Sequence, residues 1–172
     1  MINILLLDRD GVINIDKSYL SNPNDLEFVP GAVEGLQRFR DSGYRFFIFT
    51  NQSGIGHEIF TRDDFDRCMT RLFNMLDKEG IKIESYRVCP HHREQGCDCR
   101  KPKTGMWESL CEEYSDLDPE KCIMIGDKDA DIIFGKNIGC STARIISEVY
   151  PMEEKGDYTV KDLNELADIL LK

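Results

Sequence analysis

The sequence predicts an α/β fold with a doubly wound, mainly parallel sheet covered by helices on both faces. Short apolar runs without polar alternation recur along the chain, and segments with helical periodicity lie between them. Such apolar runs are typical of strands that are buried on both faces. Strands that alternate with helices imply parallel pairing with right-handed crossovers, so both observations favour the same fold class.

The individual elements follow from these patterns in chain order. Strands are expected at residues 4–7, 46–50, 86–89 and 122–125 and near 142–146, and helices at 33–42, 62–79, 106–114, 129–137 and 160–171. Gly43, Gly80 and Gly139 each follow a helical pattern where a left-handed C-cap would lie, which supports the helix ends. Residues 90–104 have no usable period, and a loop of that length in a compact domain usually has a function or a metal crosslink.

Length and composition favour one domain over residues 1–172. A chain of 172 residues with 41% hydrophobic content can bury one core, and it contains no repeat or low-complexity tract. The formal charge of −10 opposes binding to nucleic acid and to anionic membranes. No apolar stretch approaches the ~20 residues that span a bilayer, and no secretory signal is recognisable. We therefore expect a cytoplasmic protein with neither nucleic acid nor membrane as a partner. We also expect a monomer.

Two carboxylates, Asp8 and Asp10, follow the first apolar run directly, in the stretch LLLDRDGVIN. Capping of a helix is the alternative explanation, but no helical pattern begins promptly after them. Like charges at the end of a buried strand repel each other unless a cation or a proton intervenes, and Mg²⁺ prefers such oxygen ligands. In phosphoryl transfer one aspartate can attack phosphorus while a second carboxylate moves protons. This chemistry is our hypothesis for the pair.

Polar residues also follow two other predicted strands. Thr50 and Asn51 belong to FTNQSG, and Asp127 and Lys128 belong to IGDKDAD. Taken alone, the first stretch is compatible with an ordinary turn and the second with an N-cap beside a solvated lysine. Ligands of open parallel sheets bind beyond the carboxyl ends of the strands, so these groups are expected to converge with the aspartates. Together they suit Mg²⁺-dependent phosphoryl transfer.

The stretch CPHHREQGCDCRKPKTGM is the most specific in the chain. It offers five candidate ligands, of which four could close a tetrahedral zinc site; these are Cys89, His91, His92, Cys97 and Cys99. A redox pair is the alternative, and it is weaker because C-x-C lacks the usual two-residue gap. We interpret the zinc as structural, since four protein ligands leave no position for water. Zinc would also fix the position of the loop residues Arg100, Lys101 and Lys103, as phosphate binding requires. The alternative interpretation of these three residues is a solvated basic turn.

The motifs LLLDRDGVIN, FTNQSGI, CPHH…CDCRKP and IGDKDAD, in this order, resemble those of the haloacid dehalogenase superfamily of phosphatases, specifically its histidinol-phosphatase-like branch. The resemblance covers residues 3 to about 145. It implies a Rossmann-like fold without a large cap domain, with a zinc-stapled loop and an aspartyl-phosphate intermediate. It makes Asp8 the nucleophile and Asp10 the general acid and base.

The same resemblance assigns the remaining site residues. Substrate or phosphate contacts map to Thr50, Asn51, Arg100, Lys101 and Lys128. Mg²⁺ ligands map to the side chains of Asp8 and Asp127 and the backbone carbonyl of Asp10, with Asp131 supporting the site from outside the ligand set. Zinc ligands map to Cys89, His91, Cys97 and Cys99, and the choice of His91 over His92 rests on this mapping alone.

The expected substrate is a small phosphorylated metabolite, selected by three loops at about residues 14–28, 53–61 and 91–103. TNQSGI and CPHH are more similar to sugar-bisphosphate phosphatases of the branch than to histidinol-phosphate phosphatases, which carry Asp at the position of Ser53. Histidinol phosphate is the alternative substrate. A receiver-like signalling domain is the alternative from another class, but it would place its acidic pair and its phosphoacceptor on different strands. A zinc-stapled binding module is disfavoured because every expected catalytic position is filled.

Overall fold

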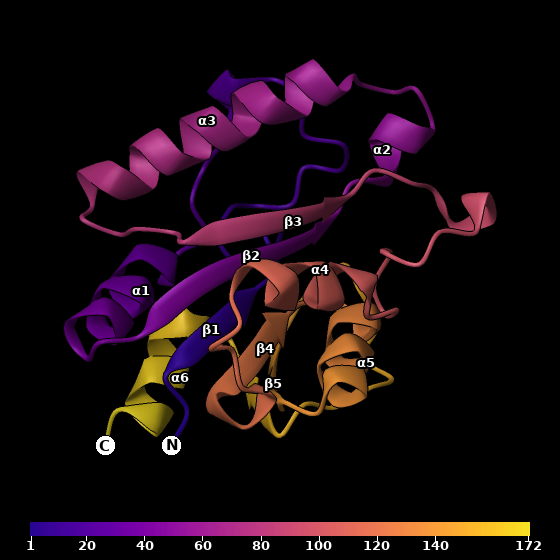
Figure 1. Cartoon of the computed structure of the whole chain (residues 1–172). Helices are drawn as coiled ribbons and strands as arrows, with labels where there is room; N and C mark the ends of the chain where they lie inside the picture. The colour runs from indigo at the N-terminus through magenta and orange to yellow at the C-terminus, as the bar shows by residue number, and fades with distance from the viewer.

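The computed structural model describes residues 1–172 and is built around one six-stranded sheet (Figure 1). The strands are β1 (Ile4–Leu7), β2 (Arg45–Asn51), β3 (Ser85–Cys89), β4 (Cys122–Gly126), β5 (Ser141–Ile145) and β6 (Tyr158–Val160). Their order in space is β3-β2-β1-β4-β5-β6, and all neighbouring strands are parallel. The five predicted strands are confirmed, and β6 adds an edge strand that the apolar pattern did not indicate.

The helices are α1 (Ala32–Asp41), α2 (Ser53–Gly56), α3 (Arg62–Lys78), α4 (Gly105–Glu113), α5 (Asp129–Ile138) and α6 (Leu163–Leu170). The predicted helix at 160–171 was wrong at its start, because Val160 ends β6 and Asp162 caps α6 by accepting a hydrogen bond from the Glu165 N–H. The single turn of α2 was not predicted. None of the helices combines the length and the apolar character that crossing a membrane requires.

Two apolar clusters, one on each face of the sheet, explain why the central strands β1 and β4 are uninterrupted apolar runs. Successive strand residues point to opposite faces. Leu5 and Leu7 therefore pack with α1, α3 and α6, whereas Leu6 packs with Phe134 of α5 and with side chains of α4. Figure 1 shows α1 and α6 on one side of the sheet and α4 and α5 on the other. The doubly wound arrangement is thus confirmed.

The strand order places a crevice between β1 and β4. The chain passes from β1 outward to β2 and β3, then crosses back to β4 on the other side of β1. At such a reversal the loops after the two central strands diverge and leave a cleft at the carboxyl edge of the sheet. Asp8 and Asp127 are the residues that directly follow these strands. The topology therefore brings together two of the predicted site residues.

Candidate active site

Three carboxylates form a buried cluster at this crevice. Asp8 follows β1, Asp127 follows β4, and Asp131 lies in the first turn of α5; their ligating oxygens lie within 4.8 Å of one another. Gly11 permits this approach, because it has a φ of +84° and a β-carbon there would lie 2.2 Å from Asp127 Oδ2. The chain thus brings Asp127 against the loop after β1 at a residue without a side chain.

The charges of this cluster are only partly balanced within the protein. Lys101 is 3% exposed, and its Nζ lies 3.0 Å from Asp8 Oδ1 and 2.6 Å from Asp131 Oδ1. Burial would lower the pKa of Lys101, but Asp131 and Asp8 together raise it. Burial raises the pKa of Asp8 to about 6 despite Lys101, and burial together with Asp8 raises the pKa of Asp127 to about 8. The buried Asp127 Oδ1 has no hydrogen-bond partner.

Asp10 is oriented by a network that includes a residue the sequence analysis did not single out. Gln52 Nε2 donates hydrogen bonds to Asp10 Oδ2 and to Thr50 Oγ1, both at 2.8 Å. Arg9 Nη2 pairs with the same carboxylate at 2.8 Å, and Asn14 Nδ2 donates to Asp10 Oδ1 at 2.9 Å. The structure therefore brings Asp10 and Thr50 together through one amide. The only sequence signal for Gln52 was its place inside FTNQSG.

Asn51 engages the backbone of Lys101. Its Oδ1 accepts a hydrogen bond from the Lys101 N–H at 3.0 Å, and its Nδ2 donates to the Lys101 carbonyl at 3.1 Å. This pair fixes the chain at Lys101 to the end of β2 and directs the lysine toward Asp8. A phosphate contact by Asn51 stays a prediction, and the geometry gives this residue a role in holding Lys101.

The loop between β3 and α4, residues 90–104, is called the cysteine–histidine loop here; together with Cys89 at the end of β3 it contains four predicted ligands. Sγ of Cys89 lies 3.6 Å from Sγ of Cys97, and His91 Nδ1 lies 3.6 Å from Cys89 Sγ and 3.3 Å from Cys99 Sγ. All cysteines are free thiols. Tetrahedral ligands around zinc would be separated by about 3.8 Å for two sulfurs and about 3.5 Å for sulfur and nitrogen. The donor set and its spacing fit a closed zinc site.

The neighbouring His92 lies outside this cluster. Its ring stacks on the ring of His57 with 4.5 Å between centroids, and its backbone N–H donates to Gln95 Oε1 at 2.8 Å. The structure therefore places only His91 among the thiols. His92 instead joins the loop to the end of α2.

A pocket of about 470 Å³ opens beside Asp10 and Lys128. All three loops that were expected to select the substrate contribute to it, with Arg93 and Arg100 coming from the cysteine–histidine loop. The loop between β5 and β6 forms an additional wall, which the sequence analysis missed. The full lining is Asp10, Asp16, Ser18, Tyr19, Leu20, Asn51, Gln52, Ser53, Gly54, Arg93, Arg100, Lys128, Asp129, Ala130, Tyr150 and Pro151.

Comparison with known proteins identifies the family. The sequence profile of the polynucleotide kinase 3 phosphatase family matches residues 3–168. A D-glycero-alpha-D-manno-heptose-1,7-bisphosphate 7-phosphatase from Campylobacter jejuni is 39% identical, with 94% of this chain and 92% of the relative covered. This chain belongs to the haloacid dehalogenase superfamily of phosphatases.

One further relative agrees with this phosphatase in length, and one solved structure agrees with it in fold. A D-glycero-beta-D-manno-heptose-1,7-bisphosphate 7-phosphatase from Pasteurella multocida is 32% identical over 96% of this chain and 95% of its own. The crystal structure of a D,D-heptose 1,7-bisphosphate phosphatase from B. bronchiseptica, complexed with magnesium and phosphate, superimposes with a TM-score of 0.85. It is 24% identical and covers 99% of this chain and 98% of its own, so it supports the fold.

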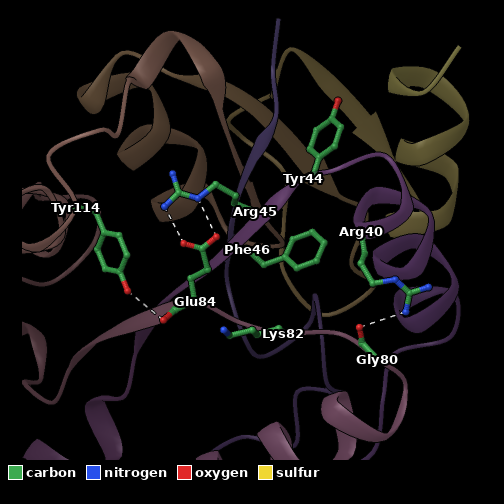
Figure 2. Close-up of a pocket in the computed structure, with 8 residues that line it drawn as sticks. All are labelled: Arg40, Tyr44, Arg45, Phe46, Gly80, Lys82, Glu84 and Tyr114. Atoms are coloured by element: carbon green, nitrogen blue, oxygen red, sulfur yellow. Dashed lines mark hydrogen bonds and ion pairs between the residues drawn. The ribbon is translucent and has the colours of Figure 1, made fainter.

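A second hollow in the phosphatase, of about 350 Å³, lies where β2 begins, at the edge of the sheet away from Asp8 (Figure 2). Figure 2 shows the Arg45 guanidinium directed at Glu84, with N–O distances of 2.7 and 2.8 Å. Tyr114 donates to the Glu84 carbonyl at 3.2 Å, and Arg40 donates to the Gly80 carbonyl at 3.3 Å. Most polar side chains that line this second hollow already have hydrogen-bond partners, and the hollow contains no cluster of carboxylates. The pocket beside Asp10 is therefore the candidate active site.

Proposed function

We propose that this phosphatase is Mg²⁺-dependent and removes the 7-phosphate of D-glycero-D-manno-heptose 1,7-bisphosphate through an aspartyl phosphate on Asp8. The observation that carries the proposal is the buried carboxylate cluster at the crevice, held by Lys101 and adjoining a pocket lined by Asp10 and Lys128. The names of the relatives at 39% and 32% identity support the choice of substrate.

The carboxylates fit a hard divalent cation. Lys101 pairs with Asp8 and Asp131, and only the longer contact of Lys128 at 3.9 Å reaches Asp127. Asp127 Oδ1 accepts no hydrogen bond, so it offers an oxygen ligand of the kind that Mg²⁺ prefers. Asp8, Asp127 and the carbonyl of Asp10 would hold the ion, and Asp131 would support the site through Lys101. When bound, Mg²⁺ would supply neutralisation of the charge on the transferring phosphoryl group.

Each residue of the site has a separate role in the reaction. The Asp8 carboxylate attacks phosphorus, and the bond from phosphorus to the sugar oxygen breaks as Asp10 gives that oxygen a proton. Asp10 next takes a proton from water, which attacks phosphorus, releases inorganic phosphate and restores Asp8. Lys101 holds Asp8 in position, while the Thr50 hydroxyl donates to a phosphoryl oxygen. The contacts of Gln52 and Arg9 keep Asp10 directed into the pocket.

Cations at the pocket wall suit a substrate with a second phosphate. Arg93, Arg100 and Lys128 line the pocket, and the first two lie on the cysteine–histidine loop. A zinc ion held by Cys89, His91, Cys97 and Cys99 would fix that loop as a closed tetrahedral crosslink. Arginine suits such recognition because its planar donors match phosphate oxygens.

We further propose that residues 1–172 act as one domain and as a cytoplasmic monomer. The net charge of −10 supports a small metabolite as the substrate in preference to a polynucleotide.

The substrate proposal is tested by phosphate release from a panel of esters in the presence of Mg²⁺. We expect kcat/KM for the heptose bisphosphate to exceed that for histidinol phosphate by about 100-fold, because only the bisphosphate engages the cations at the wall. Phosphorus NMR of the product identifies the phosphate that leaves. Comparable turnover of histidinol phosphate would overturn the ranking, and a long-lived aspartyl phosphate without turnover would favour a signalling role.

The acidic cluster makes a prediction about stability. The native pKa values of Asp8 and Asp127, about 6 and about 8, exceed the ordinary value of 3.8. Between pH 3.8 and about 8, these two carboxyl groups therefore bind more protons in the native state than in the unfolded chain. The free energy of unfolding of the metal-free protein should therefore fall as the pH rises from about 4 to about 8. Mg²⁺ should stabilise the protein most at the upper end, where it no longer competes with protons.

Thermal melts in EDTA and in Mg²⁺ across this pH range check the prediction. Asp127→Asn should flatten the pH dependence in EDTA and remove most of the Mg²⁺ effect, whereas Asp77→Asn, an exposed substitution on α3, should behave as the wild type. Equal Mg²⁺ stabilisation in wild type and Asp127→Asn would contradict the assignment of the cluster.

A further inference from the structure

The Lys128 ammonium lies between two loops that are distant in the sequence. Its Nζ is 3.0 Å from Asp16 Oδ2, 4.4 Å from the centre of the Tyr150 ring and 3.9 Å from Asp127 Oδ1. A lysine ammonium on its flexible stem normally samples many positions. Here the side chain is 35% exposed, and all three groups lie within 4.4 Å of the ammonium. The cation is thus held in place at the wall of the pocket.

Tyr150 acts on this ammonium by two routes. Its hydroxyl donates to Asp16 Oδ2 at 2.8 Å, the same oxygen that accepts from Lys128. The phenol therefore orients the carboxylate that holds the lysine. The face of the ring also attracts the ammonium through its quadrupole. Loss of Tyr150 would loosen both restraints at once.

The loop that carries Tyr150 is itself anchored. Arg144 is fully buried at β5, and its Nη2 donates to the Pro151 carbonyl at 3.0 Å. Its Nη1 donates to Asp129 Oδ1, also at 3.0 Å. Asp129 is the first residue of α5 and directly follows Lys128. The tyrosine and the lysine are therefore tied to the same helix end, which keeps their relative position constant.

We propose that Tyr150 is a positioning residue that holds the Lys128 ammonium in place to bind substrate phosphate. The inference rests on the proposed function, in which Lys128 contacts phosphate. Tyr150, Asp16 and Lys128 line the same pocket as Asp10, so an anion beside the acidic cluster can reach the ammonium. A cation that is ordered before binding loses less conformational entropy when the anion arrives.

The test measures the dissociation constant of inorganic phosphate by calorimetry, and KM and kcat for the ester, with the Mg²⁺-loaded protein. Tyr150→Phe keeps the ring and removes the hydroxyl, and should raise the phosphate dissociation constant and KM about fivefold with a smaller change in kcat. Tyr150→Ala removes both the hydroxyl and the ring, and should raise the phosphate dissociation constant and KM about twentyfold. Tyr44→Phe, at the hollow of Figure 2, is the matched control and should leave the phosphate dissociation constant and KM unchanged.

A double-mutant cycle separates positioning from a general structural role. In a Lys128→Met background, Tyr150→Phe should have no further effect on phosphate binding, because the group it positions is gone. The same fold-change in both backgrounds would overturn the inference, as would unchanged phosphate binding in Tyr150→Ala. A wild type that hydrolyses no phosphate ester would instead refute the proposed function, so the two failures are distinguishable.

Discussion

Asp8→Asn is expected to lower kcat by about four orders of magnitude or more while the fold is retained. The carboxamide has nearly the shape of the carboxylate but is a poor nucleophile, so no aspartyl phosphate can form. Lys101 keeps its pair with Asp131 at 2.6 Å, and the loss of one negative charge reduces repulsion from Asp127. The melting temperature of the metal-free protein should therefore stay within about 3 °C of the wild type.

Phosphate release with purified protein, combined with circular dichroism melts, measures both parts of this expectation. Asp77→Asn makes the same chemical change on the exposed face of α3 and should leave kcat unaltered. Turnover by Asp8→Asn at more than about one hundredth of the wild-type rate would refute Asp8 as the nucleophile. The attacking group would then have to be sought among the other side chains of the pocket.

Cys97→Ser has the second-largest expected effect, because it acts on stability and activity together. Loss of one ligand should release the loop that carries Arg100 and Lys101. The stability cost should be about 3 kcal/mol, comparable with a crosslink that closes a loop of about fifteen residues. For a chain of this size this corresponds to a fall in melting temperature of about 6 to 12 °C. Activity should fall at least about tenfold, since Lys101 holds Asp8 from this loop.

Metal content, melting temperature and kcat/KM of the variant measure these effects. Cys111→Ser is the control, because Cys111 lies on α4 outside the cysteine–histidine cluster. It should retain the bound metal and the activity. If Cys97→Ser kept wild-type metal content, melting and kinetics, the loop would not be held by zinc.

The strong local patterns predicted most of the fold. The two central strands, β1 and β4, are apolar throughout because both faces of the sheet are covered, and α3 begins at a capping box formed by Thr61 and Asp64. The short strand β6 escaped the sequence analysis because it lies at the sheet edge and buries only Val160. Its apolar residue was instead assigned to the start of the following helix. Local composition could not separate these two possibilities.

Several site contacts depended on side-chain direction, which spacing does not determine. Both amide atoms of Asn51 bond the Lys101 backbone, a contact that its place in FTNQSG did not indicate. His91 and His92 are neighbours of identical chemistry, and the structure places only His91 with the thiols. Tyr150 belongs to no motif, and its approach to Asp16 joins residues 134 positions apart. Such contacts arise from how loops fold over the sheet.

The sequence by itself determined the class of fold, the strand ends that carry acidic groups, and the ligands available to a metal, because burial periodicity and residue chemistry are local properties. The tertiary structure decided which of these groups meet. The return of the chain from β3 to β4 places Asp127 beside Asp8, and the loop after β3 inserts Lys101 between Asp8 and Asp131. Lys101 and Asp8 are 93 residues apart. Their contact is set by strand order and by hydrogen bonds between loops, and neither of these produces a periodic pattern of residues in the sequence.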